Sequence, residues 1–441
     1  FIVSQTKEMS AALVQRAMSE GTKLSDETLA QLRATPVMEL VESLHTALTS
    51  TDVKTASLAI HILGRSSQAR SEPLNKAAVI TLLQFLGMKC RNYGTADAAI
   101  EAVGAVVAGL VATMGTDDEL FLDAEVLQAL IKDVLGHVHV QSTVLTTRRI
   151  CLGIFGSLIE NSAVRSVVLR SPEAVAEGSP ALGSIFLKIF LGAIEGERDP
   201  VLLHRVFLLS ASVLTSAPDV LVAFLRDDYF DCFASYFPVL FNAPPGCTVS
   251  RDDLRTALHG LLSLEIFTDL SLPFLCTKLT SPSSTAKVDS LHVIRDIFRR
   301  SDPNTAVGQL APQTGETMMH LRAEALKINT MRERSPDALE LLRLCMDVMT
   351  TVAGAACDVT VGDDSMLLSL LDAVVGGAIT TMETDNTAGR TYATLLHACS
   401  RSRSRVAFVL TRYLVPMIGS LMQSPSSASL RLRRLENCFS C

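Results

Sequence analysis

The chain has 441 residues, of which 48% are hydrophobic and 19% are charged, and this balance excludes a chain that is disordered throughout. Its net charge of -7 argues against a dedicated nucleic-acid-binding protein, because affinity for phosphate comes mainly from clustered Lys and Arg. The length exceeds that of one compact domain, so we expect either several domains or one elongated array.

Helix starts recur along the chain as a Ser, Thr or Asp followed by proline. The first side chain accepts an otherwise unpaired backbone N–H, and proline, which has no N–H, presets φ for the first helical turn. These pairs are Thr35-Pro36, Ser171-Pro172, Ser179-Pro180, Asp199-Pro200, Ser281-Pro282, Asp302-Pro303, Ser335-Pro336 and Ser424-Pro425. Together with helical apolar spacing, they predict about twenty-two helices of roughly ten to twenty residues.

Two stretches in the first half of the chain have features of a transmembrane span or of a β-strand, and neither assignment is adopted. Residues 98–115 are the richest apolar stretch, but they contain Glu101, are rich in Ala and Gly, and are too short for a transmembrane span. Residues 137–140, HVHV, alternate as a strand does, yet they are isolated. We therefore predict an all-α protein. We expect Gln141 and Ser142, which follow, to cap a helix or to bridge adjacent repeats.

Aromatic residues gather between Phe224 and Phe241. The helical spacing of Phe230, Phe233 and Phe237 predicts a place in the core, whereas rings near an exposed Pro-Pro-Gly loop could also anchor a partner protein. After this cluster, Pro244, Pro245 and Gly246 predict a stop before a helix capped by Ser250 and Asp253.

Further along, an apolar stripe at helical spacing predicts an amphipathic helix over residues 287–299, with most charged side chains off the stripe. The stripe consists of Val288, Leu291, Ile294 and Phe298, and the charged residues are Lys287, Asp289, Arg295, Asp296 and Arg299.

A second class of proline indicates an internal repeat. Pro238, Pro273 and Pro416 each lie in an apolar run, and SPSS follows both Pro273 and Pro416 at the same distance. We interpret all three as kink prolines of apolar first helices, each followed by a polar turn and an amphipathic helix. This unit resembles the HEAT repeat of about 40 residues. The predicted fold is thus an all-α HEAT-repeat α-solenoid, a superhelix of about eleven antiparallel helix pairs.

Motifs for catalysis, nucleotide binding and metal binding are missing from the sequence. No Walker P-loop, GxGxxG turn, HExxH, GxSxG elbow or kinase signature occurs. Cys438 and Cys441 form one CxxC spacing without a second close pair, and His137 and His139 would point to different faces of a helix. We predict that the protein is not an enzyme, with no catalytic residue, cofactor, metal site, membrane association or small-molecule substrate, and no direct binding of nucleic acid.

Four blocks, in this order and spacing, resemble the MMS-nineteen family of HEAT-repeat nucleotide excision repair and transcription proteins. They are HVHVQSTVLTTRR (residues 137–149), EGERDP (195–200), SYFPVLFNAPPG with SRDDL (235–254) and AKVDSL (286–291). The resemblance is strongest from Val37 to Arg300. Because family members are more than twice as long, it implies the N-terminal part of a longer protein or a shortened relative.

The resemblance implies a non-enzymatic adaptor of the cytosolic iron-sulfur protein assembly targeting complex, in cytoplasm and nucleus. Its partners would be the targeting subunits and iron-sulfur apoproteins of DNA repair, replication and transcription. The alternative is a generic HEAT transport or trafficking scaffold of importin or adaptin type. We expect residues 1–300 to form the HEAT array that matches the family's N-terminal domain, and residues 301–441 to continue the solenoid with further, truncated repeats. The candidate partner-contact residues are Glu195, Glu197, Arg198, Tyr236, Phe237, Pro244, Pro245 and Gly246.

Overall fold

The computed structural model describes residues 2–68, 74–114, 120–170, 182–242, 244–300, 303–329, 331, 335–359, 411 and 415–423. These residues are mostly helical and contain no strand. Contacts divide the chain into two units, which are described separately. Unit 1 is Phe1–Cys232 with Ala243–Leu254, and unit 2 is Phe233–Asn242 with Arg255–Cys441. The expected division at residue 300 stays a prediction.

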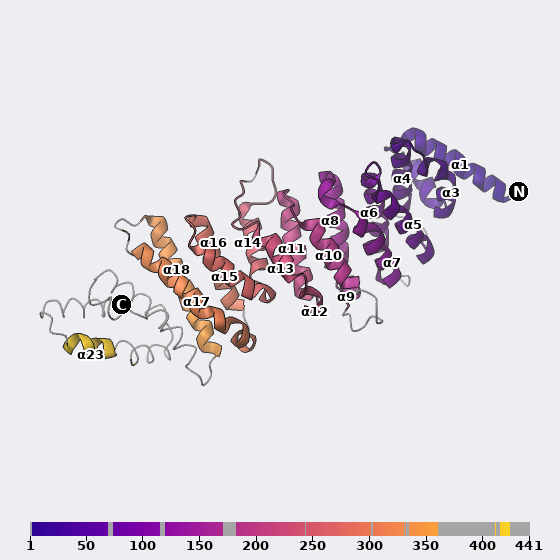
Figure 1. Cartoon of the computed structure of the whole chain (residues 1–441). Coiled ribbons are helices and arrows are strands. Elements are labelled where there is room, and N and C mark those ends of the chain that lie inside the picture. The colour runs from indigo at the N-terminus through magenta and orange to yellow at the C-terminus, as the bar shows by residue number, and fades with distance from the viewer. Residues whose placement is uncertain are drawn as a thin grey trace. The chain divides into compact units, whose positions relative to one another are not determined.

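Unit 1 consists of helices joined by short connections (Figure 1). In chain order they are α1 (Ile2–Glu20), α2 (Asp26–Ala34), α3 (Val37–Leu48), α4 (Val53–Ser67), α5 (Lys76–Cys90), α6 (Ala96–Ala112), α7 (Ala124–Gln128), η2 (Ala129–Val134), α8 (Leu145–Glu160), α9 (Ser162–Val168), α10 (Leu182–Ile194), α11 (Pro200–Ser216) and α12 (Asp219–Val222). Short 3-10 turns are formed by Leu120–Leu122, Leu135–His137 and Val140–Ser142. Helices α13 (Arg226–Ala234) and α14 (Arg251–Leu262) cross the division between the units.

The helices of unit 1 pack as the two layers of a HEAT solenoid. In one layer, called here the second row, α4 packs on α6, α6 on α8, and α8 on α11. In the other layer, α3 packs on α4, α5 packs on both α6 and η2, and α10 contacts η2. Each helix pair therefore covers the apolar side of its neighbours, as stacked repeats must do to bury a continuous core. The prediction of an all-α HEAT-type solenoid is confirmed.

Prolines after a polar residue begin helices as expected at three of the five pairs whose proline the structure describes. Pro200, Pro303 and Pro336 are the first residues of α11, α17 (Pro303–Asn329) and α18 (Pro336–Val359). The Asp199 carboxylate accepts a hydrogen bond from the backbone N–H of Leu202, 3.0 Å away. The Ser335 hydroxyl likewise accepts one from the backbone N–H of Ala338 at 3.2 Å. Pro36 is instead the N-cap of α3, and Pro282 precedes α16 (Ser284–Arg300) by two residues. The pairs at 171, 179 and 424 lie outside the described residues.

The interpretation of the second class of proline as helix-internal is confirmed for Pro273 and wrong for Pro238. Pro273 lies inside α15 (Thr268–Leu279), whereas α13 ends at Ala234 and Pro238 lies in the loop that follows. Pro416 lies in α23 (Val415–Gln423), a helix that directly follows residues that the structure does not describe, so its interpretation as a kink proline stays a prediction. Apolar surroundings alone do not distinguish a proline inside a helix from one beyond its end.

Aromatic side chains fill the core of unit 1 around α8, α10 and α13. The rings of Phe155, Phe186 and Phe190 lie 5.2–6.0 Å apart. Tyr229 is fully buried, and its hydroxyl donates a hydrogen bond to the carbonyl of Leu187 at 2.7 Å, which ties α13 to α10. Burial raises the pKa of Tyr229 well above its usual value, so this hydroxyl remains a donor.

The rings predicted to be core are buried. Phe230, in unit 1, is buried on α13. Phe233 and Phe237, in unit 2, are buried against Phe267 and Phe274, with ring centroids 6.3 and 5.6 Å apart. The core interpretation of this stretch is therefore confirmed for these three rings.

Unit 2 is built from α15 (Thr268–Leu279), α16 (Ser284–Arg300), α17 (Pro303–Asn329), α18 (Pro336–Val359), α23 and a 3-10 turn at Glu265–Phe267. Helix α15 packs on α16 and α17, and α18 packs on α16 and α17. The apolar stripe predicted for residues 287–299 faces these neighbours, with Leu291, Ile294 and Phe298 buried on α16.

Charged residues of α16 that we expected off the stripe are also buried, and this expectation is wrong for Lys287 and Asp289. They are 5% and 1% exposed. The Lys287 ammonium pairs with Glu324 of α17, which is itself buried. Asp289 Oδ1 lies 3.8 Å from Arg255 Nη1 and 3.8 Å from His259 Nε2, both on α14. Because neighbouring helices cover α16 on several sides, the charge of Lys287 and Asp289 did not indicate that their side chains are exposed.

Acidification from pH 7.5 to pH 5 is expected to destabilise unit 2 through His259. Burial lowers the pKa of His259 to about 3, helped by His292 and Arg255, and the Asp289 contact at 3.8 Å is too long for an offsetting hydrogen bond. In the unfolded chain the His259 imidazole binds a proton near pH 6.5, whereas in the folded unit it stays neutral at that pH. The contribution of neutral His259 to the free energy of unfolding is therefore fully present above about pH 6.5 and is lost as the pH falls toward 3. At pH 5 the loss is roughly 2 kcal/mol.

Urea unfolding at the two pH values measures this effect. His259→Gln should remove most of the pH-dependent difference, whatever it does to stability at pH 7.5. His320→Gln is the matched control, because His320 lies on α17 of the same unit and its side chain is 34% exposed. The explanation fails if His259→Gln leaves the difference between the two pH values unchanged.

Candidate protein-interaction surface

Three connections of unit 1 are joined by hydrogen bonds into what we call the loop edge, residues 91–95, 138–144 and 195–199. The Tyr93 hydroxyl donates to the carbonyl of Ser142 at 3.4 Å. Gln141 Nε2 donates to the carbonyl of Ala193, at the end of α10, at 2.8 Å. The expectation that Gln141 bridges adjacent repeats is confirmed. The edge is thus a linked surface rather than a set of independent loops.

A histidine and an arginine fix the first part of this edge. Arg91 Nη2 lies 2.7 Å from His137 Nε2, and because a guanidinium can only donate, Nε2 is the acceptor. His137 Nδ1 then carries the ring proton and donates it to the carbonyl of Asp133 at 2.9 Å. Both ring nitrogens are used within unit 1, which gives His137 a structural role.

Glu197 stabilises the third connection of the loop edge, residues 195–199, from its buried side. Its carboxylate is 1% exposed and lies 3.0 Å from Arg148 Nε on α8. Oε1 also accepts hydrogen bonds from the backbone N–H groups of Arg198 and Asp199, each at 2.9 Å. Arg148 in turn donates to the carbonyl of Thr143 at 3.0 Å. The blocks at 137–149 and 195–200 are therefore joined through one ion pair, in which the carboxylate is buried and the guanidinium is partly exposed.

The predicted partner-contact residues separate by exposure. Glu195, Arg198, Pro244, Pro245 and Gly246 are exposed in unit 1, and Gly246 has φ +82°, which favours glycine. In unit 2, Tyr236 is half-buried and Phe237 is 6% exposed. Burial leaves Glu197 and Phe237 no side-chain surface for a partner, so we retain only the exposed residues and Tyr236 as a proposal.

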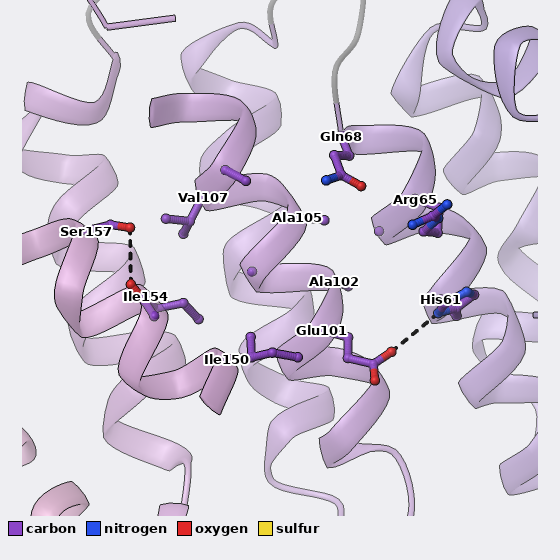
Figure 2. Close-up of a pocket in the computed structure, with 14 residues that line it drawn as sticks. His61, Arg65, Gln68, Glu101, Ala102, Ala105, Val107, Ile150, Ile154 and Ser157 are labelled. Atoms are coloured by element: carbon purple, nitrogen blue, oxygen red, sulfur yellow. Dashed lines mark hydrogen bonds and ion pairs between the residues drawn. The ribbon is translucent and has the colours of Figure 1, made fainter. Parts of the chain in front are cut away.

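A groove that the sequence analysis missed lies on the second row, across α4, α6 and α8, with a volume of about 430 Å³ (Figure 2). Its floor is the side of α6 that carries Gly104, Ala105 and Ala108. Longer side chains stand on both sides, among them Arg65 on α4 and Ile150 on α8. The volume falls in the range of about 300–1,000 Å³ that is usual for ligand sites.

Small residues create this groove. A Cβ atom at Gly64 would lie 2.6 Å from Ala102 Cα, so α4 and α6 approach each other too closely for any other residue at 64. At one end, His61 Nδ1 lies 3.4 Å from Glu101 Oε2, which links the same two helices. The Ala- and Gly-rich composition of residues 98–115 was the signal in the sequence that could have indicated this groove.

Reactive groups do not converge in the part of the chain that the structure describes. Burial raises the pKa of five thiols there, to about 11 for Cys276 and about 12 for Cys90, Cys151, Cys232 and Cys345, which makes these five poor nucleophiles. No cluster of three metal-ligating side chains occurs among the described residues. Cys438 and Cys441 lie outside them. Among the same residues, no single helix has the length and composition to cross a membrane.

Comparison with known proteins gives one family. Residues 41–327 match the family model described as "Dos2-interacting transcription regulator of RNA-Pol-II", MMS19_N. The MMS19 nucleotide excision repair protein homolog of Danio rerio is 26% identical over 262 residues, 58% of this chain and 23% of that protein. The DNA repair/transcription protein MMS19 of Saccharomyces cerevisiae is 28% identical over 180 residues, 40% of this chain and 16% of that protein. The chain thus spans less than a quarter of these relatives' length.

Solved structures with some likeness include other helical repeat proteins. Karyopherin Kap121p bound to the SUMO protease Ulp1p is 13% identical with a TM-score of 0.34, and the match covers 99% of this chain and 40% of that one. Importin beta is 14% identical with a TM-score of 0.34, covering 94% and 53%. The assignment of the fold rests on the helix packing described above.

Proposed function

Because the chain belongs to the MMS19 family, whose N-terminal model matches residues 41–327, we propose that it is a protein-binding scaffold in DNA repair and transcription. The family match is the observation that carries this proposal. The solenoid supports it, since stacked repeats present long surfaces for protein partners. In this proposal the chain is not an enzyme and acts in the nucleus and cytoplasm.

More finely, we propose that the scaffold is an adaptor of cytosolic iron-sulfur protein assembly. It would present apoproteins of DNA repair, replication and transcription to the targeting subunits for cluster insertion. The support is the resemblance of the four blocks between residues 137 and 291, two of which meet at the Arg148–Glu197 ion pair. The cluster would be cargo of the assembly complex, because five of the thiols are buried and have a raised pKa. They are Cys90, Cys151, Cys232, Cys276 and Cys345.

Affinity purification with the tagged chain tests the proposal. We expect iron-sulfur apoproteins and targeting subunits to be enriched in quantitative mass spectrometry over an unrelated HEAT solenoid used as the control bait. Binding should then be reproduced with purified partners in size-exclusion chromatography. Enrichment of nuclear-transport or vesicle-coat components, with none of the iron-sulfur proteins, would contradict the proposal and favour a transport scaffold.

A further inference from the structure

The groove across α4, α6 and α8 has a charge pattern of its own. Glu101, its acidic lining residue, is already next to His61 at 3.4 Å. Further along α8, Glu160 lies 3.6 Å from Arg205. Each of these two acidic side chains therefore already has a nitrogen-bearing neighbour within unit 1, the imidazole of His61 or the guanidinium of Arg205.

Two arginines beside the groove are different. Arg65 lines it from α4, and Arg149 lies on α8, immediately before the lining residue Ile150 and one turn before Gly153. Both are exposed, and neither forms a hydrogen bond or ion pair with another described residue. The groove thus combines an apolar floor with exposed arginines on its two flanks, neither of which is paired within the part of the chain that the structure describes.

The shape of the groove favours a helix as its occupant. Ala105 and Ala108 lie three residues apart on one face of α6, so the floor runs along the axis of that helix. Taller side chains of α4 and α8 stand on either side of this line (Figure 2). Helices pack with their axes about 8–10 Å apart, and the smallest separations need small residues at the contact.

From this geometry we propose that the groove binds an amphipathic α-helix of a partner protein. The apolar face of that helix lies on Ala105 and Ala108, and Asp or Glu residues beside that face pair with Arg65 and Arg149. Apolar contact supplies affinity, and the two arginines select acidic helices and reject basic ones. The inference does not depend on the iron-sulfur pathway, because it concerns the chemistry of the occupant and not its identity.

The test selects ligands for the full chain from a displayed library of randomised 16-residue peptides on a helical frame. We expect selected peptides to carry an apolar stripe flanked by Asp and Glu. Fluorescence anisotropy with such a peptide should show at least tenfold weaker binding by Ala105→Leu, which fills the groove. Arg65→Glu should weaken binding several-fold and should improve binding of the same peptide with its Glu residues changed to Lys.

Matched variants separate groove binding from other effects. Lys188→Glu changes an exposed charge on α10, outside the second row, and should leave binding unchanged. Ala108→Leu fills the groove at an exposed position and replaces Ala105→Leu if circular dichroism shows that the latter is misfolded. The proposal is overturned if no peptide is selected, if selected peptides lack acidic residues, or if Ala105→Leu and Ala108→Leu both bind as the unchanged chain does. Failure of the affinity purification would leave this result unaffected.

Discussion

Replacing Glu324 by leucine is expected to lower the free energy of unfolding of unit 2 by about 3–5 kcal/mol. Glu324 pairs with Lys287, and the two side chains are each 7% exposed between α16 and α17. Removal of the carboxylate leaves an ammonium group in a site that water does not reach, and desolvation of the unpaired charge is the main cost. Urea unfolding followed by circular dichroism measures the loss.

A double variant separates this cost from the value of the pair itself. Lys287→Met with Glu324→Leu removes both charges and keeps most of the apolar volume, so we expect stability near that of the unchanged chain or above it. An exposed pair, Arg343 with Glu340 on α18, provides the control, since loss of Glu340 should cost well under about 1 kcal/mol. A loss of similar size for Glu340→Leu and Glu324→Leu would show that burial is not the cause.

The second large effect is expected for Gly87→Ala in α5. A Cβ atom at this position would lie 2.1 Å from the carbonyl oxygen of Asp133 in η2, and 2.8 Å from its carbonyl carbon. Backbone atoms cannot move aside as the end of a side chain can, so α5 and η2 must separate. We expect a loss of about 1–3 kcal/mol or more in unfolding free energy.

Gly192→Ala in α10 is the matched control for this prediction. No atom lies within 4 Å of the added Cβ, and alanine is the better helix former by about 1 kcal/mol, so this change should stabilise unit 1 slightly. Thermal unfolding of the two variants compares them directly. If Gly87→Ala is as stable as Gly192→Ala, the close packing of α5 on η2 is contradicted.

The helix starts show which structural features the local sequence determines. Asp199 with Pro200, and Ser335 with Pro336, begin helices because a cap and a preset φ act within three residues of each other. The capping box of Ser250 and Asp253 likewise forms, with hydrogen bonds of 2.8 Å and 3.1 Å in the two directions. The error at Pro238 arose because apolar neighbours are common both inside helices and just beyond them.

The candidate surface was predictable only in part. The four sequence blocks pointed to residues 195–198, and the loop edge contains them, but Glu197 is a buried anchor rather than a contact. Its partner, Arg148, is 49 residues away in sequence. The groove depends on α4 approaching α6 at Gly64 and Ala102 and on α8 approaching α6 at Ile150 and Gly104, and no local pattern connects these residues.

Helix formation, the repeat and the family therefore follow from the order of residues, because capping, φ restriction and apolar periodicity act over a few positions. Which charges are buried, which glycines are irreplaceable and where a groove opens were settled by packing between repeats. Lys287 illustrates the difference: its burial is tolerated because Glu324 arrives from the next helix, 37 residues later. A contact of that kind depends on how helices stack, and the free energy of stacking is shared among many residues of both repeats.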